Sequence, residues 1–169
     1  MRVVLSKVAL LALLAVPMPT LAANARTPVA VIGDNKIKLE VASTPQQIER
    51  GLMYRMSLPE DQGMVFLFHP PSGVKFWMAH CFINLDMLMI KDGKIVKIFE
   101  NVPPCKEHDL SRCATYPAAS EPAIEVSEVV EVIGGYSKRH NVHEGDSVKF
   151  LLPNGKPAFE MKVHSEKAK

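Results

Sequence analysis

The segment of residues 76–90 holds most of the side chains whose types and spacing could do chemistry in this chain. His80, Cys81 and Asp86 supply an imidazole, a thiol and a carboxylate within an otherwise nearly continuous apolar run, and Trp77 is the only tryptophan. A carboxylate that is removed from water costs several kcal/mol unless it is hydrogen-bonded or paired. Asp86 must therefore have a partner, and that partner decides whether the residue is structural or functional.

The adjacent residues His80 and Cys81 would form a nucleophile and its base if their side chains met. If this segment is a strand, neighbouring side chains point to opposite faces, so His80 cannot readily activate Cys81. An apolar environment also disfavours a thiolate. No serine lies in a Gly-x-Ser-x-Gly context. These patterns predict a buried thiol at Cys81 and no catalytic residue, which argues against an enzyme.

Arg55 is the candidate partner of Asp86. One interpretation is structural: a hydrogen-bonded bridge between the two side chains would fix a short helix against the sheet. The other is functional: Arg55 and Asp86, together with Trp77 and His80, would line a ligand pocket that is otherwise built from aromatic and methionine side chains. The structural interpretation is favoured, and the sequence leaves both open.

Methionine and histidine raise the question of a copper site. Thioether and imidazole ligands would suit Cu(I). However, most of the methionines fall where apolar periodicity predicts core, and the histidines are scattered, mostly in turns. The sequence therefore predicts no metal site and no cofactor. A copper-handling protein or an enzyme, with a pocket around Asp86, Arg55 and Trp77, is the alternative.

Residues 1–25 have the pattern of an export signal. Arg2 and Lys7 give a positive start, residues 8–16 form a short apolar stretch, and the alanines between positions 22 and 25 offer cleavage sites. The apolar stretch is too short, and too soon followed by proline, to span a bilayer comfortably. We expect a periplasmic or extracellular protein with no stable membrane span once the signal is removed.

The excess of basic over acidic residues lies in this predicted signal. Removing Arg2 and Lys7 from the 20 basic residues leaves 18, against 18 acidic residues. A neutral domain gives no support for nucleic-acid binding, which needs clustered positive charge, or for attraction to anionic membranes. Residues 26–169 have the length of one domain, with a core expected at about 29–163, and we expect a monomer.

Cys105 and Cys113 lie in a polar segment that is flanked by prolines. In an oxidising compartment this spacing predicts a local disulfide that closes a surface loop. The alternative is a metal-binding or redox pair, which is less favoured because the spacing is not Cys-x-x-Cys.

The remaining pattern is rich in short β-strands. Thr44, Pro45 and Gln47 predict the capped start of a helix over 45–54, and the apolar residues of 129–133 before Gly134 predict one or two helical turns. Residues 69–73 are expected to form a turn between two strands. Strands are expected at 29–32, 37–41, 65–68, 75–78, 87–90, 94–99, 124–126, 147–152 and 158–163. This pattern favours a single compact domain that is mainly β with short helices, as a β-barrel-like or α+β fold.

Five short motifs follow one another at familiar spacings. They are GLMYR at 51–55, GMVF at 63–66, FWM at 76–78, LDM at 85–87 and GDSV at 145–148. In these motifs the chain resembles the family called domain of unknown function 192, over roughly residues 29–163. The resemblance implies a small β-barrel-like domain that is frequently exported in bacteria, and it implies no established activity.

The function expected from these patterns is a non-enzymatic, exported module. Its partner would be an unknown small ligand or a component of the cell envelope. No catalytic set of residues emerges from the sequence, because the strongest patterns indicate core and turns.

Overall fold

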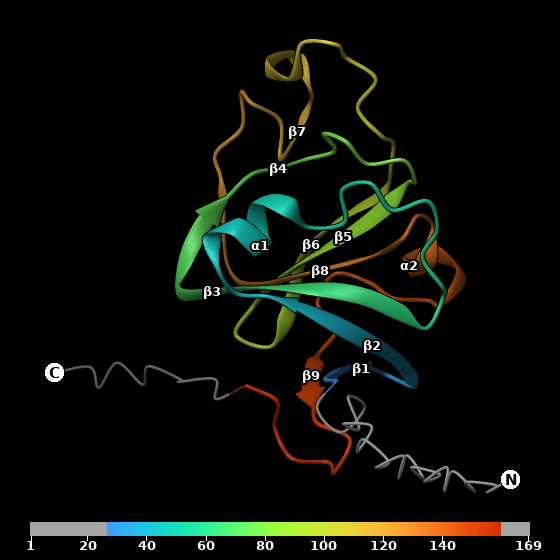
Figure 1. The fold of residues 1–169 in the computed structure, drawn as a ribbon. Helices are drawn as coiled ribbons and strands as arrows, with labels where there is room; N and C mark the ends of the chain where they lie inside the picture. The colour runs from blue at the N-terminus through green and yellow to red at the C-terminus, as the bar shows by residue number, and fades with distance from the viewer. Residues whose placement is uncertain (1–26, 160–169) are drawn as a thin grey trace, which may run out of the picture.

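The computed structural model describes residues 27–159 of the 169-residue chain (Figure 1). Within these residues, seven strands form one sheet in the order β6-β5-β8-β3-β2-β1-β9, and two short strands, β4 and β7, form a second sheet. The strands are β1 (Val29–Ile32), β2 (Asn35–Ala42), β3 (Gln62–Val74), β4 (Phe76–Trp77), β5 (Leu85–Lys91), β6 (Lys94–Val102), β7 (Thr115–Tyr116), β8 (Ile124–Ile133) and β9 (Val148–Leu151). The helices are α1 (Pro45–Arg50) and α2 (Tyr136–Arg139), with a 3-10 turn at Leu110–Arg112.

The large sheet curls until its two ends approach each other. The segment before β9 exchanges backbone hydrogen bonds with the start of β6. The N–H of Gly145 donates to the carbonyl oxygen of Ile95 at 2.7 Å, and the N–H of Ile95 donates to the carbonyl oxygen of Asp146 at 3.0 Å. An isolated antiparallel bridge joins Lys94 to Ser147. The fold is thus mainly β and barrel-like, which confirms the fold class expected from the sequence.

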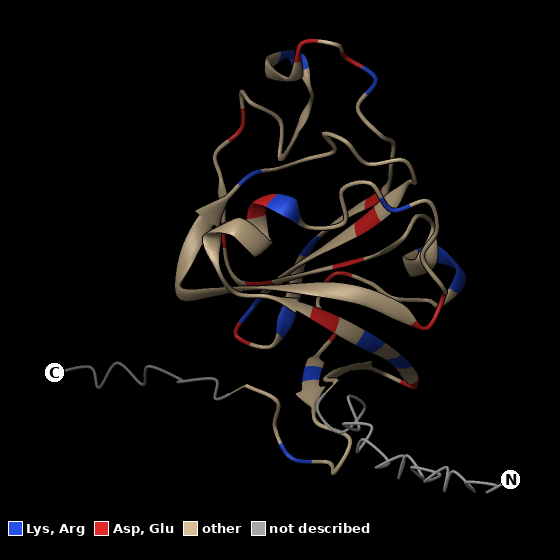
Figure 2. Ribbon diagram, in the orientation of Figure 1, with Lys and Arg blue, Asp and Glu red and all other residues tan. Residues whose placement is uncertain are grey.

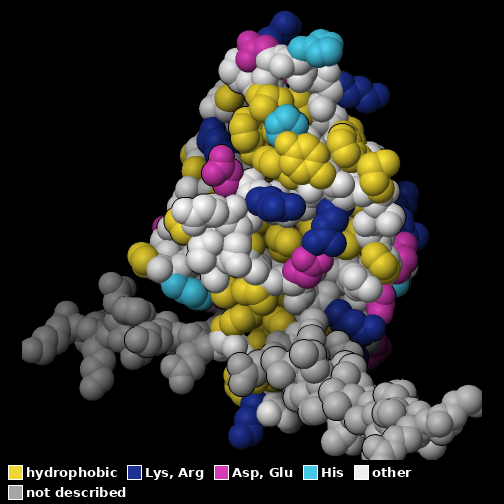
Figure 3. Space-filling view, in the orientation of Figure 1, with side chains coloured by type: hydrophobic (Ala, Val, Ile, Leu, Met, Phe, Trp, Pro, Cys, Tyr) yellow, Lys and Arg dark blue, Asp and Glu magenta, His cyan; other side chains and the backbone are white. Residues whose placement is uncertain are grey.

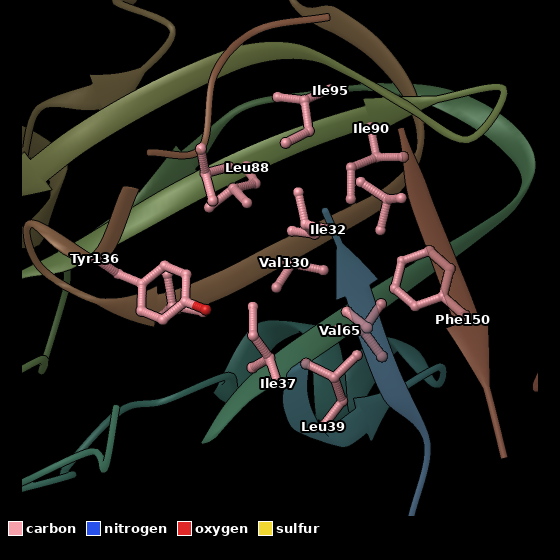
Figure 4. Packing of buried hydrophobic residues seen from close by; sticks show 14 of the residues in the cluster. Ile32, Ile37, Leu39, Val65, Leu88, Ile90, Ile95, Val130, Tyr136 and Phe150 are labelled. Carbon is pink, nitrogen blue, oxygen red and sulfur yellow. The ribbon is translucent and has the colours of Figure 1, made fainter. Parts of the chain in front are cut away.

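The inner face of the curled sheet holds one hydrophobic core. In β8, Val130 and Val132 belong to this core, and Leu88 and Ile90 of β5 face the same side because side chains alternate along a strand. Figure 4 shows the side chains of Leu88, Ile90 and Val130 pointing toward those of β1, β2 and β9, with the ring of Tyr136 at one end. Burial of these side chains stabilises the barrel through the hydrophobic effect.

The outer face of β3, β5 and β8 carries a second core, which includes Phe66, Met87 and Val129. In Figure 1, helix α1 and the loops that lead to β4 and β7 lie over this face. The start of α1 follows from local sequence: the Thr44 side chain accepts a hydrogen bond from the N–H of Gln47, whose own side chain accepts from the N–H of Thr44. The expected helix over 45–54 is confirmed in type and start, and it ends at Arg50.

Two expectations for strands β3 and β8 are wrong. Residues 69–73 do not form a turn between strands, because β3 continues through them, with a break in its register against β8 between Leu67 and Ser72. Residues 129–133 are not helical: they complete β8, which pairs with β3 on one side and β5 on the other. A central strand that is covered on both faces is apolar at successive positions, so its pattern also satisfies a helical period. The helix that does follow is α2, after Gly135.

Some of the expectations concern residues at the two ends of the chain, outside the described range. The predicted signal at 1–25 lies there, as do residues 160–163 of the last expected strand. Ala158 and Phe159, which are described, are not in a strand. No helix within the described part of the chain has the length and apolar character needed to cross a bilayer.

Candidate functional site

A cavity of ≈ 340 Å³ lies between helix α1 and the outer face of the sheet. The last turn of α1, the following residues to Met53, and the stretch from Gly73 to Trp77 form its sides. Its apolar walls include Ile48, Leu52, Phe66, Phe68, Phe76 and Trp77. The volume is at the lower end of the range that is typical of small-molecule sites, and so is suited to a ligand of modest size.

Aromatic packing and one glycine set the shape of this cavity. The Phe76 ring meets the Phe66 ring edge to face at a centroid distance of 5.0 Å and the Phe68 ring at 6.3 Å. Gly51 ends α1 with φ +42°, and a Cβ at this position would lie 3.1 Å from the Phe66 ring. Only glycine adopts this φ readily, and its missing side chain lets the helix end approach Phe66. The motif at 51–55 thus positions one wall of the cavity.

Glu131 is the acidic residue of the cavity floor. It belongs to β8, where it pairs with Met64 of β3 and Met87 of β5, and it is only 4% exposed. No hydrogen bond or ion pair to its carboxyl group is found among the described residues. Burial raises the pKa of Glu131 to about 8, because the charged form loses its hydration. At neutral pH this carboxyl group is therefore mostly protonated and can donate a hydrogen bond.

Cys81 also lines the cavity, as a free and buried thiol. Burial, together with a smaller effect of the nearby Glu131, raises the pKa of Cys81 to about 12. A thiol with this pKa is almost wholly protonated at neutral pH, so it is a poor nucleophile. The structure thus gives a physical reason for the expected inert, buried thiol.

The disulfide loop supports the wall that carries Trp77. Cys105 and Cys113 are joined by a disulfide, as the sequence predicted. The N–H of Cys105 donates to the carbonyl of Met78 at 3.1 Å, and Trp77 pairs with Thr115 in the small β4–β7 sheet. The hydrogen bond from Cys105 and the strand pairing of Thr115, two residues after Cys113, therefore hold β4 in place beside the cavity.

Exposed aromatic side chains continue from the cavity onto the surface. Tyr54 stacks on His80 at a centroid distance of 5.2 Å and meets Phe82 at 6.1 Å. Tyr54, Phe82 and Trp77 are among the exposed large hydrophobic residues. Figure 3 shows hydrophobic side chains gathered around a histidine on the upper part of this face, with basic and acidic side chains below them.

Asp86 does not lie in this cavity. Its carboxylate is completely buried and accepts three backbone hydrogen bonds, from the N–H groups of Asn101 at 2.7 Å, Gly135 at 2.6 Å and Ser137 at 2.8 Å. These donors come from the end of β6 and the start of α2. A carboxylate that accepts several amide hydrogen bonds is well compensated for its burial. Asp86 therefore anchors α2 across one end of the barrel.

The expected pairing of Arg55 with Asp86 is not found, and this part of the sequence interpretation is corrected. Arg55 instead forms an ion pair with Glu40 of β2, with 2.6 Å between Nη2 and Oε2, and both side chains are 41–50% exposed. The backbone amides already occupy the Asp86 carboxylate, and Asp86 lies on the inner face of the sheet whereas Arg55 lies on its outside. The two residues belong to separate structural contacts.

His80 is separated from Cys81 for a different reason from the one expected. Residues 78–84 form a loop and not a strand, and His80 has a left-handed φ of 56°. Its side chain is exposed beside Tyr54, whereas that of Cys81 is buried. Of the four residues proposed to line a pocket, Trp77 lines the cavity, His80 lies on the adjoining surface, and Arg55 and Asp86 lie elsewhere.

Metal-binding chemistry has few candidate ligands near the cavity. No group of three or more His, Cys, Asp or Glu residues among the described part of the chain is placed to hold a metal ion. His140 is stacked on Tyr136 at 4.1 Å and lies 3.2 Å from Glu60. Met64, Met78, Met87 and Met89 are buried in the outer core, where they pack against other apolar side chains.

Known proteins share both the sequence pattern and the fold. A comparison with protein families matches residues 28–150 to DUF192, described as "Uncharacterized ACR". A search of curated proteins found no match. A solved structure of a putative transcription regulator from Sinorhizobium meliloti 1021 is 31% identical, with a TM-score of 0.60, and the match covers 73% of this chain and 91% of that chain.

A second solved structure is a protein of unknown function from Novosphingobium aromaticivorans DSM 12444. It is 29% identical, with a TM-score of 0.60, and the match covers 80% of this chain and 94% of that chain. The family match extends from just before β1 to the last strand, β9, and so contains the curled sheet and the whole cavity. The resemblance seen in the sequence motifs is confirmed: the chain belongs to the DUF192 family.

Proposed function

We propose that this protein is an exported module that binds a small, largely apolar ligand in the cavity beneath α1. The observation that carries the proposal is Glu131, a buried carboxyl group that lines an apolar cavity and has no hydrogen-bond partner among the described residues. The buried side-chain atoms that lack a hydrogen-bond partner among the described residues are Thr115 Oγ1, Glu128 Oε1 and Ser137 Oγ, so the Glu131 oxygens are not sealed in the core and reach the cavity. A ligand in the cavity can therefore supply a hydrogen-bond partner to this carboxyl group, and such a bond contributes about 0.5–1.5 kcal/mol.

The surroundings of Glu131 favour binding of a ligand over a purely structural purpose. Trp77, Phe76 and Phe68 offer flat apolar surface on the walls, and Trp77 is 41% exposed at the edge. Apolar walls with one placed polar group are the usual composition of small-molecule sites. A residue kept only for stability at this position of β8 would be apolar, like Val129, its neighbour on the same face of the strand.

A titration with an apolar probe tests the binding function. Ethylbenzene, followed by backbone and indole N–H NMR shifts, is expected to perturb Trp77 and the residues around Glu131. Replacing Ala79, which is buried in the cavity wall, by leucine fills part of the space, so Ala79→Leu should abolish these shifts. Ala123→Leu, at an exposed position, is the matched control and should bind as the parent does. Shifts that spread evenly over the surface, or that survive Ala79→Leu, would contradict the proposal.

Export is supported by two features of the chain. Residues 1–25 have the pattern of a signal peptide, and a disulfide such as Cys105–Cys113 is typical of oxidising compartments. Cell fractionation with mass spectrometry of the N-terminus is the test. The expected result is a periplasmic or extracellular protein that begins between residues 23 and 26. A cytoplasmic protein that retains Met1 or Arg2 would overturn it.

Nucleic-acid binding is not extended to this chain from the Sinorhizobium structure, which is described as a putative transcription regulator. Figure 2 shows basic and acidic residues interspersed over the ribbon. Binding to a phosphate backbone draws its affinity from clustered Lys and Arg. The mixed charge pattern therefore gives such a function no support.

Acid–base catalysis by Glu131 is the second candidate function. A carboxyl group with a pKa of about 8 changes protonation near neutral pH, as a general acid or base must. The two functions differ in the fate of the ligand. A binding module returns its ligand chemically unchanged after prolonged incubation, whereas an enzyme converts it, and the Glu131→Gln variant would then bind without converting.

A further inference from the structure

We propose that the ligand carries an uncharged hydrogen-bond acceptor, such as a carbonyl oxygen, on an apolar body, and that Glu131 recognises this acceptor as a hydrogen-bond donor. The inference rests on the proposed binding function and adds the chemical class of the ligand. It follows from three features: the titratable groups near Glu131, its burial, and the composition of the cavity.

The groups that face Glu131 leave its carboxyl group uncharged. Cys81 approaches it from the loop before β5, and its thiol is protonated. Helix α1 contributes Glu49 and Arg50, and Lys75 precedes β4, but all three are exposed at the edge of the cavity. The ammonium group of Lys75 donates to the carbonyls of Ala118 at 3.0 Å and Ala119 at 2.9 Å, so it is already engaged.

The β-strands that flank Glu131 contribute apolar neighbours. It pairs with Met64 on one side and Met87 on the other, and burial is the cause of its raised pKa of about 8. No basic side chain acts on it strongly enough to favour the carboxylate. A neutral carboxyl group has both a donor and an acceptor, and its O–H can donate a hydrogen bond to a carbonyl oxygen.

A cationic ligand fits this site less well than a neutral one. It would have to ionise Glu131 and lose its own hydration in an apolar cavity, and the desolvation of a buried ion pair often exceeds the attraction gained. Two of the three charged residues at the cavity edge, Arg50 and Lys75, are also basic and repel a cation. An anionic ligand would have to leave water for the same apolar walls with no cation beside Glu131. An uncharged acceptor avoids both costs.

Three probes of similar size separate these ligand classes: acetophenone, ethylbenzene and benzylammonium. They are titrated into the purified protein at pH 6.5, with NMR shifts of the cavity residues giving each Kd. One additional hydrogen bond is expected to make acetophenone bind about tenfold more tightly than ethylbenzene. Benzylammonium is expected to bind more weakly than acetophenone.

Variants of Glu131 and a pH series identify the donor. Acetophenone affinity should fall about fivefold between pH 6 and pH 9, because most of the donor protons of Glu131 are lost through a pKa of about 8. Glu131→Gln keeps an amide donor that does not titrate, so it should bind acetophenone with no loss at pH 9. Glu131→Leu should lose the advantage of acetophenone and keep the binding of ethylbenzene, which also shows that the variant is folded.

The outcomes that overturn the inference differ from those that overturn the binding function. If benzylammonium binds most tightly, and more tightly as the pH rises, the site recognises cations through a carboxylate. If acetophenone and ethylbenzene bind equally at all pH values, Glu131 does not act as the donor. In both cases the cavity still binds ligands and the proposed function stands. If none of the probes perturbs the cavity residues, the proposed function itself fails.

Discussion

The carboxylate of Asp86 and the backbone N–H of Ser137 are joined by a 2.8 Å hydrogen bond across 51 residues of sequence. Through this contact β5, which lies between β6 and β8 in the sheet, holds the first turn of α2. The same carboxylate also accepts a hydrogen bond from the N–H of Asn101, near the end of β6. One buried acid thus connects three segments at one end of the barrel, which explains why a charge is retained inside an apolar run.

Replacing Asp86 with asparagine should destabilise the fold strongly. The variant keeps the shape of the side chain, but its NH₂ group would face backbone N–H donors and leave at least one of them unpaired in the core. We expect the free energy of unfolding in urea to fall by about 2–4 kcal/mol. Asp34→Asn, at an exposed turn, is the control and should change stability by less than about 0.5 kcal/mol. A similar small effect for Asp86→Asn would contradict the anchoring of α2.

The ion pair between Arg55 and Glu40 should contribute little to stability. Its atoms are 2.6 Å apart, but both side chains are largely in water, where hydration and salt screen the attraction. A double-mutant cycle with Arg55→Gln and Glu40→Gln should give a coupling of about 0.2–1 kcal/mol that weakens in high salt. The same cycle between Arg55→Gln and Asp86→Asn should give no coupling, and a clear coupling there would restore the pairing first expected from the sequence.

Local signals in the sequence correctly predicted the elements that depend on neighbouring residues. The capping residues Thr44 and Gln47 fix the start of α1. Asp92 and Gly93 both have positive φ, 52° and 70°, which is the conformation that an Asp-Gly hairpin turn requires. Such elements can be predicted because the interactions that stabilise them lie within a few positions of one another.

Strand β8 shows why the site itself was missed. Its residues pack on both faces, so the apolar pattern also fits a helix, and pairing with β3 and β5 decides between the two. In the helical interpretation Glu131 falls among polar positions and attracts no notice. In a buried strand the same residue becomes an acid within an apolar layer. The partners of Asp86 were hidden for a similar reason, because backbone amides leave no trace in the amino-acid sequence.

Adding a methyl group at Gly51 should distort the cavity wall. Gly51→Ala places a Cβ 3.1 Å from the Phe66 ring and also strains a residue with φ +42°. Gly33→Ala is a matched control, since its φ is +57° and no atom lies within 4 Å of the added Cβ. We expect a loss of about 1 kcal/mol for Gly33→Ala and roughly 1–3 kcal/mol more for Gly51→Ala, measured by urea unfolding. Equal losses would mean that Phe66 moves away freely.

Removing the disulfide should destabilise the protein and loosen the wall that carries Trp77. The bridge closes a short loop, with a sequence separation of 8, and loop-closure entropy gives a loss of about 2–3 kcal/mol for the Cys105→Ser, Cys113→Ser double variant. The fluorescence of Trp77, the only tryptophan in the chain, should shift to the red as β4 becomes more exposed to water. Ser120→Ala, at an exposed position in the same region, is the control and should leave both stability and fluorescence unchanged. An unchanged stability of the double variant would show that the β4–β7 pairing suffices.

The buried acid Glu131 should make the protein less stable as the pH rises. Its pKa is raised from 4.5 to about 8 in the folded state, so between these values the folded protein binds a proton that the unfolded chain has released. Below pH 4.5 Glu131 is therefore protonated in both states and does not lower the free energy of unfolding. Between pH 4.5 and about pH 8 its effect lowers that free energy by about 1.4 kcal/mol per pH unit, and by at most roughly 5 kcal/mol in total. Burial also raises the pKa of Glu128, which adds a decline of the same sign.

The Glu131→Gln variant isolates this contribution, because its amide cannot ionise. Relative to the parent, it should gain stability steadily between pH 5 and pH 8 in urea unfolding, while the decline from Glu128 remains in both proteins. Glu100→Gln, on the exposed side of β6, should follow the parent at every pH. Parallel stability curves for the parent and Glu131→Gln would mean that Glu131 is charged in the folded state. In that case the donor that we propose for ligand recognition would be absent at neutral pH.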